Sequence, residues 1–275
     1  MLDTKHLKKD YTESNYFQSK FNSYYKLVET DKAYDLTDIF LKQLKSLFKI
    51  SCSTEQICDL HNKLNEELKV YDQKFGVNKI SEHFYEMPND FNKKYIELLK
   101  FQIKNLIGQD FYFQSNPTVR IQVPHISSQT FYPMFHSDVQ LGHPPYEINL
   151  WMPLNPPSEE EGYGFSVSSL EESAKIFKKY NYDILQINNN KKYISNYLKS
   201  ISKTQNFSYG QTLLFDTRCI HSTIPLKNHT RVSVDVRIIP VDLFHKFNHH
   251  YVGTGRRTVI YKPGNAYYKN SIDEL

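Results

Sequence analysis

Two stretches of the sequence carry residues that could bind one metal ion. His136 and Asp138 are two residues apart in FHSDVQLGHPPYEINLWMPLNPP, and His221 lies in LLFDTRCIHSTIPLKNHTRVSVDVRIIP. On extended backbone, residues two apart leave the same face of a strand, so the first pair can share an ion. Two histidines and one carboxylate make a facial triad, which suits Fe(II) and leaves coordination positions open. The first pair alone is weak, since a chain with 11 His is expected to hold roughly one His-x-Asp/Glu by chance.

The segment that begins ten residues after His221 could bind an anionic co-substrate. Its residues alternate between a polar face and an apolar face: Arg231, Ser233, Asp235 and Arg237 on the first, Val232, Val234, Val236 and Ile238 on the second. A polar face is ordinary on a strand with one side in water. Next to metal ligands, however, the Arg231 guanidinium is placed to hold a dicarboxylate through a charge-assisted contact, with Ser233 as a hydroxyl donor.

The elements that must position these residues change character after Gly108. Apolar residues recur every three or four positions in 32–50, 53–71 and 89–106, so residues 1–108 are predicted to be mostly helical. Beyond Gly108, short segments rich in β-branched and aromatic residues predict strands: TVRIQVPHI, YEINLWMPL, GQTLLFDT and RVSVDVRIIP. A helix is expected at SSLEESAKIFKKYNYD, and residues 188–203 form a polar insertion.

This order of elements predicts a mainly-β fold with helical cover. We expect a double-stranded β-helix, that is, a cupin-like jelly roll, whose outer face is covered by the preceding helices. The length fits a single domain. We expect a helical N-terminal region at 1–108, a jelly-roll core at 109–242 with a helical insertion around 168–206, and a C-terminal extension at 243–275.

Composition restricts the partners and the compartment. The 34 basic and 30 acidic residues give a net charge of only +4, which predicts neither a nucleic-acid nor a membrane partner. Three cysteines without paired spacing are typical of reduced thiols. No secretion signal and no apolar run of about 18 residues occurs, so we expect a cytoplasmic protein that acts on a small molecule. The oligomeric state is not predicted.

The motifs together resemble a known family. H136-S-D138, then H221, then R231-V-S233-V-D235-V-R237 resembles the Fe(II)/2-oxoglutarate-dependent oxygenases of the phytanoyl-CoA dioxygenase superfamily. FHSDVQLGHPPYEINLWMPL with TRVSVDVRIIP and the late GRRTVIYKPGNAYY is similar to its streptomycin-biosynthesis-type branch. The resemblance covers Arg120 to about Tyr268.

The resemblance implies a function and its site residues. His136, Asp138 and His221 would be the Fe(II) ligands, and Arg231, assisted by Ser233, would hold the distal carboxylate of 2-oxoglutarate. Asn149 and Gln122 become candidate co-substrate contacts. With O2, such an enzyme hydroxylates a small polar metabolite, such as an amino sugar, an amino acid or a secondary-metabolite or glycan precursor, and releases succinate and CO2. Family members that halogenate have a small residue where Asp138 stands, so oxygen transfer is favoured here.

Two other functions stay open from the sequence. A jelly-roll protein without a redox metal could bind or modify sugars, with His136 and His221 as acid and base. An oxygenase acting on nucleic acid is the third hypothesis, suggested by the basic stretch 245–262, although its basic density is low.

Other candidate residues have ordinary alternatives. His245, His249 and His250 could bind a metal, but no carboxylate lies beside them, and a surface or packing role is favoured. His143 either lines the mouth of the pocket or closes a Pro-rich turn. Cys219 is predicted to be a buried thiol without a catalytic role.

Overall fold

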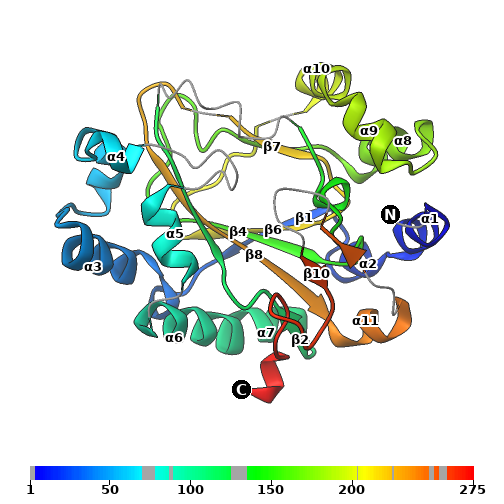
Figure 1. The fold of residues 1–275 in the computed structure, drawn as a ribbon, viewed down its shortest axis with the longest axis horizontal. Helices are drawn as coiled ribbons and strands as arrows, with labels where there is room; N and C mark the ends of the chain where they lie inside the picture. Colours follow the sequence, from blue (N-terminus) through cyan, green and yellow to red (C-terminus); the bar gives the residue numbers. More distant parts are fainter. Residues whose placement is uncertain are drawn as a thin grey trace.

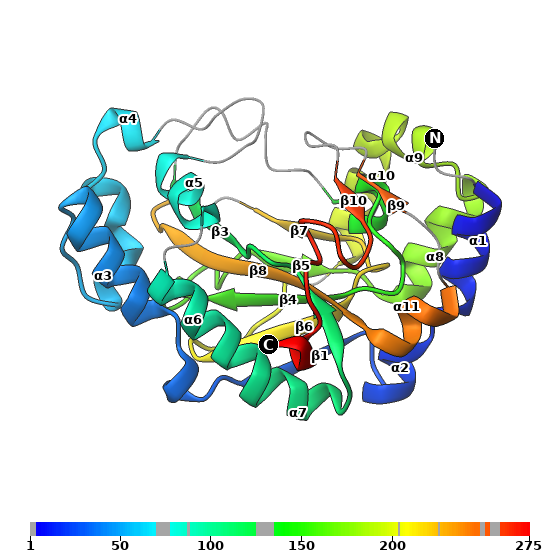
Figure 2. The same ribbon diagram turned by 60° about the horizontal axis from the view of Figure 1, so that its bottom comes forward.

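In the part of the chain that the structure describes, the strands assemble into one large antiparallel sheet and two small two-stranded sheets. The structure, a computed structural model, describes residues 4–69, 78–86, 89–124, 135–202, 204–224, 226–247, 251–253 and 259–275. Within these ranges the large sheet has six strands. Its neighbouring strands follow one another in the order β1 (Tyr25–Glu29), β6 (Gln211–Asp216), β4 (Ile148–Pro153) and β8 (Arg231–Pro240). Both β2 (Phe111–Phe113) and β3 (Thr118–Gln122) pair with β8 (Figures 1 and 2). The second sheet pairs β5 (Phe165–Val167) with β7 (His221–Thr223), and β9 (Tyr251–Val252) pairs with β10 (Ile260–Tyr261).

The sheet of β5 and β7 faces the large sheet across aromatic side chains. The ring of Trp151 on β4 lies 5.2 Å from that of Phe165 on β5, and Phe215 on β6 lies 5.6 Å from the same ring. These contacts belong to one apolar cluster between the sheets. Two antiparallel sheets packed face to face, with helices outside, confirm the predicted jelly-roll architecture.

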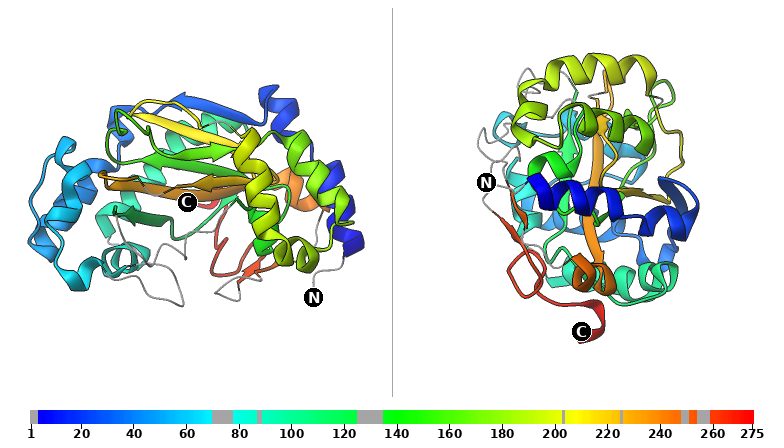
Figure 3. Two further views of the ribbon diagram at one scale, coloured as in Figure 1. Left: turned by 90° about the horizontal axis from the view of Figure 1, so that it is seen from above. Right: turned by 90° about the vertical axis from the view of Figure 1, so that its right-hand side faces the viewer.

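Helices gather at two ends of the large sheet (Figures 1 and 3). One group consists of α3 (Thr37–Phe48), α4 (Glu66–Lys69), α5 (Lys79–Tyr85) and α6 (Asn89–Glu97), and continues through a π-helical turn (Leu98–Ile103) into α7 (Lys104–Ile107). The other group consists of α1 (Thr4–Glu13), α2 (Tyr16–Phe21), α8 (Leu170–Lys179), α9 (Ile184–Asn189), α10 (Lys191–Ile201) and α11 (Val241–Phe247). None of the helices in the described ranges is long and apolar enough to cross a membrane.

The first helical group covers the outer face of the large sheet. Helices α6 and α7 run alongside it (Figures 1 and 2). Phe40 of α3, Phe84 of α5 and Tyr95 of α6 share one apolar core with the valines of β8. The predicted helical cover is therefore confirmed, and the opposite face of β8 is left for the cavity.

Some local predictions differ from the structure. The expected helix at 53–71 is a 3-10 helix (Glu55–Asn62) followed by the short α4. Strand β1 interrupts the region predicted to be helical, because its backbone pairs with β6 far along the chain. Helix α10, by contrast, lies within the expected helical insertion around 168–206, where it forms over the buried Ile194 and Leu198, which are four residues apart.

Candidate metal centre

The three predicted ligand side chains meet between the two sheets. One ligand atom from each of His136, Asp138 and His221 lies within 4.8 Å of the others, and the described residues contain no second group of this kind. The Nε2 atoms of both histidines are 3.9 Å from Asp138 Oδ1. Such distances leave room for a metal ion between the three atoms.

Backbone pairing brings the two histidines together. The amide of His136 donates to the carbonyl of His221 at 3.0 Å, and the amide of His221 donates back at 2.7 Å. Their rings lie 4.6 Å apart between centroids. The two distant sequence motifs are therefore neighbours on adjacent extended segments.

Asp138 reaches the site by a turn, which corrects the expectation of a shared strand face. Ser137 caps a 3-10 helix that begins at Asp138 (Asp138–Leu141), and the Gln140 side chain accepts from the Ser137 amide at 2.6 Å. Because this 3-10 turn, held by the Gln140 side chain, bends the chain directly after His136, strand alternation does not set the direction of the carboxylate.

His221 is oriented for metal binding. Its Nδ1 lies 3.1 Å from the carbonyl of Cys219, to which a protonated Nδ1 donates, so that Nε2 keeps its lone pair toward the site. Burial lowers the pKa of His221, although the charge of Asp138 acts in the opposite direction. The lowered pKa favours the neutral imidazole, the form that binds a metal. The thiol of Cys219 is buried in the apolar cluster between the sheets.

Asp138 presents one oxygen without a partner. Its Oδ2 accepts from Arg237 Nε at 3.0 Å and lies 2.9 Å from Nη2. Its Oδ1 is buried and has no hydrogen-bond partner. Burial acts to raise the pKa of Asp138, but the charge of Arg237, joined in acid by those of protonated His143, His221 and His136, holds that pKa well below its usual range. An ionised, buried oxygen without a partner is costly, and a cation at the site would satisfy it.

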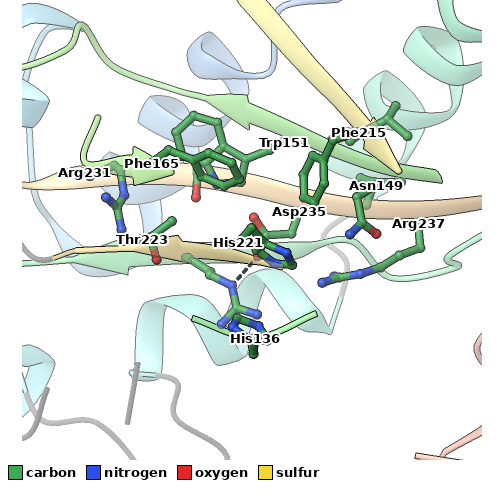
Figure 4. A pocket seen from close by; sticks show the side chains of 14 residues that line it. His136, Asn149, Trp151, Phe165, Phe215, His221, Thr223, Arg231, Asp235 and Arg237 are labelled. Atoms are coloured by element: carbon green, nitrogen blue, oxygen red, sulfur yellow. Dashed lines mark hydrogen bonds and ion pairs between the residues drawn. The ribbon is translucent and has the colours of Figure 1, made fainter. Parts of the chain in front are cut away.

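A cavity opens beside these ligands (Figure 4). It is lined by Arg120, His136, Asn149, Leu150, Trp151, Phe165, Phe215, His221, Thr223, Arg231, Ser233, Asp235, Val236 and Arg237. Arg231 and Arg237 enter it from β8 on opposite sides of His221 (Figure 4). The lining thus combines aromatic walls with charged groups.

The predicted co-substrate residues occupy different positions. Arg231 Nη1 donates to the carbonyl of Tyr163 and, at 3.1 Å, to that of Ile224, so its guanidinium has a defined orientation. Ser233 and Asn149 also line the cavity, and both polar atoms of the Asn149 amide are buried without a partner. Gln122 pairs with Arg231 across the strands and its amide is likewise without a partner, but it is not among the residues that line the cavity.

The sequence did not show which partners Arg237 and Arg120 have. Arg237 contacts a ligand carboxylate, and Arg120 forms an ion pair with Asp235 inside the cavity. Alternation on β8 identifies Asp235 and Arg237 as residues of the polar face, but nothing local shows which distant group each one meets.

Two other candidate histidines, His143 and His245, are in the described residues and do not line the cavity. His143 Nδ1 is 2.8 Å from Glu147 Oε2, and its Nε2 is 2.8 Å from the hydroxyl of Tyr261. The hydroxyl of Tyr268 donates to the other oxygen of Glu147 at 2.6 Å, so His143 belongs to a buried network and does not line the cavity. His245 is in α11, while His249 and His250 lie outside the described residues.

Comparison with known proteins gives structural similarities at low sequence identity. No family model and no curated protein matches the chain. EctD from S. alaskensis with bound Fe is 12% identical, with a TM-score of 0.46 over 92% of this chain and 83% of that one. HygX from Streptomyces hygroscopicus with nickel and 2-oxoglutarate bound is 10% identical, with a TM-score of 0.46 over 83% and 87%. The non-heme alpha ketoglutarate dependent carbocyclase SnoK from nogalamycin biosynthesis is 9% identical, with a TM-score of 0.46 over 88% and 85%. These TM-scores are below 0.5, so the similarities do not assign a function, and the side chains of the cavity must do so.

Proposed function

We propose that this chain is a non-haem Fe(II)/2-oxoglutarate-dependent oxygenase. The observation that carries the proposal is the meeting of His136, Asp138 and His221 around the buried Asp138 Oδ1, which has no partner. Two imidazole nitrogens and one carboxylate oxygen are the ligand set that is typical of non-haem Fe(II) oxygenases.

The proposed cofactors are Fe(II), 2-oxoglutarate as co-substrate and O2. His136, Asp138 and His221 would hold the metal. When bound, iron together with O2 and 2-oxoglutarate supplies the oxidising power to hydroxylate an unactivated carbon, with release of succinate and CO2.

The residues of the cavity would bind and orient the co-substrate. Arg231 carries a guanidinium suited to a carboxylate, and its orientation is set by the carbonyls of Tyr163 and Ile224. Ser233 lies two residues further on the same face of β8 and would add a hydroxyl donor. Asn149 is proposed as a further contact from β4, and Gln122 as a weaker candidate because it is not part of the lining.

The walls of the cavity support a small polar substrate. Trp151, Phe165 and Phe215 form an apolar side that excludes water, while Asn149 and Asp235 each present buried polar atoms without partners. Buried polar groups of this kind are satisfied by a ligand that carries donors and acceptors. We propose hydroxylation of a small polar metabolite, such as an amino sugar, an amino acid or a related precursor.

Succinate release tests the proposal. Purified protein with Fe(II), ascorbate and 2-oxoglutarate is expected to form succinate slowly even without its substrate, and Asp138→Ala is expected to reduce this rate to background. Asp90→Ala, which removes an exposed carboxylate on α6, serves as the matched control and is expected to keep the wild-type rate. Undiminished turnover by a folded Asp138→Ala protein, or a wild-type protein that takes up neither Fe, Ni nor Co, would overturn the proposal.

A further inference from the structure

We propose that Arg237 is a positioning residue that restricts Asp138 to a single oxygen for metal binding. This inference rests on the proposed function, because it concerns the same metal site. It assigns a role to a buried arginine that is itself neither a metal ligand nor the proposed anchor of the co-substrate.

The geometry of the ion pair carries the inference. A guanidinium and a carboxylate commonly form two parallel hydrogen bonds, one to each oxygen. Here Nε, at 3.0 Å, and Nη2, at 2.9 Å, both approach the same oxygen, Oδ2 of Asp138. Oδ1 is left without a hydrogen-bond partner and is 3.9 Å from Nε2 of His136 and of His221. Oδ2 is thus bound by Arg237, and Oδ1 remains available to a metal ion.

Arg237 and Asp138 are carried by backbone elements of different kinds. Arg237 lies on β8, where it is the cross-strand partner of Asn149 on β4. Asp138 lies at the start of a 3-10 helix, and its side chain is fully buried while that of Arg237 is 12% exposed. The central strand therefore holds the guanidinium, and the guanidinium in turn fixes the rotation of a carboxylate that comes from a turn.

The consequence concerns the open coordination positions. A carboxylate can bind a metal through one oxygen or through both. If both oxygens of Asp138 turned to the metal, one of the positions needed for the co-substrate and O2 would be occupied. By keeping Oδ2, Arg237 preserves these positions.

Charge and geometry predict opposite effects of substitution. The positive charge of Arg237 repels a cation, so an arginine that acted only through charge would make metal binding weaker, and its removal would make binding tighter. An arginine that positions the ligand has the reverse effect. Arg237→Lys separates the two, because lysine keeps the charge but provides a compact, flexible ammonium in place of the planar fork.

Titration of the metal-free full chain with Co(II) tests this. Loss of a partner that orients a ligand typically weakens metal affinity by 10–100-fold, so Arg237→Lys is expected to bind Co(II) at least about 10-fold more weakly than wild type, with a changed visible spectrum. Arg218→Lys is the matched control, since Arg218 also forms a buried ion pair with an aspartate, Asp216, and neither residue is among those that line the cavity. It is expected to keep the wild-type Co(II) affinity and spectrum.

A second variant keeps the test decisive if lysine is not tolerated at this position. Arg237→Gln is also expected to bind Co(II) more weakly. Wild-type affinity and spectrum in Arg237→Lys, or tighter binding by Arg237→Gln, would overturn the positioning role while leaving the proposed function intact. A wild-type protein that binds no Co(II) would overturn both. Thermal unfolding of each metal-free variant separates loss of the fold from loss of the site.

Discussion

The two faces of strand β8 bury different kinds of residue. On one face, Val232, Val234, Val236 and Ile238 pack into the apolar core shared with α3, α5 and α6. On the other, Arg231, Ser233, Asp235 and Arg237 line the cavity beside the metal ligands. Both faces are largely withdrawn from water, so β8 does not follow the usual pattern of one buried and one solvated face.

The difference shows how one strand serves both stability and binding. The valines contribute through the apolar area that they remove from water, which does not depend on direction. The charged residues are tolerated because each has a defined partner: Asp138 for Arg237, Arg120 for Asp235, and two backbone carbonyls for Arg231. Substitutions on the two faces should therefore affect different measurements.

The largest effect is expected at Arg231. Truncating one member of a buried, hydrogen-bonded charge pair costs about 2–5 kcal/mol, so Arg231→Ala should raise the Kd for 2-oxoglutarate by at least roughly 30-fold. Calorimetric titration of the Co(II)-loaded protein measures this. Arg231→Lys should recover part of the loss, and the Co(II) affinity should stay as in wild type. If Arg231→Ala bound 2-oxoglutarate with the wild-type Kd, Arg231 would not be the residue that binds the co-substrate.

The apolar face should respond in stability alone. Val234 is fully buried and lies between Val119 of β3 and Met152 of β4. Val234→Ala removes two methyl groups from this core, so it should lower the free energy of unfolding by about 1–3 kcal/mol. Urea denaturation measures the loss. If Val234→Ala also changed the Co(II) or 2-oxoglutarate affinity, the two faces would not be independent.

A smaller effect is expected at Ser233. A single hydroxyl hydrogen bond contributes about 0.5–1.5 kcal/mol, so Ser233→Ala should weaken 2-oxoglutarate binding by roughly 2- to 13-fold. Ser233→Thr, which keeps the hydroxyl, serves as the comparison. A wild-type Kd in Ser233→Ala would restrict co-substrate binding on this face to the guanidinium.

Elements with strong local patterns were predictable from the sequence. The segment RVSVDVRIIP is β8 over its full length, and the helical periodicity at 89–106 corresponds to α6, the π-helical turn and α7. Strand β1 was not predictable, because five residues gain their strand character only by pairing with β6 across the fold. The helix expected at 53–71 formed tight 3-10 turns over Ile57 and Leu60, both buried in the core, so packing decided its form.

The candidate site divides in the same way. The residue types His, Asp and Arg and their spacing pointed to four residues: His136, Asp138, His221 and Arg231. Of these, His136, His221 and Arg231 line one cavity, and Asp138 lies next to the two histidines. The turn that begins at Asp138 was missed because HSD fits the alternation of a strand, whereas the hydrogen bond from the Ser137 amide to the Gln140 side chain holds it in a 3-10 turn.

By itself, the sequence determined which residues can serve as metal ligands and which face of β8 is polar, because side-chain chemistry and strand alternation are local properties. Only the tertiary structure decided that Arg237 holds one oxygen of Asp138 and that the other stays without a partner. That division depends on the distance between a central strand and a turn, and such a distance is set by the packing of the whole sheet.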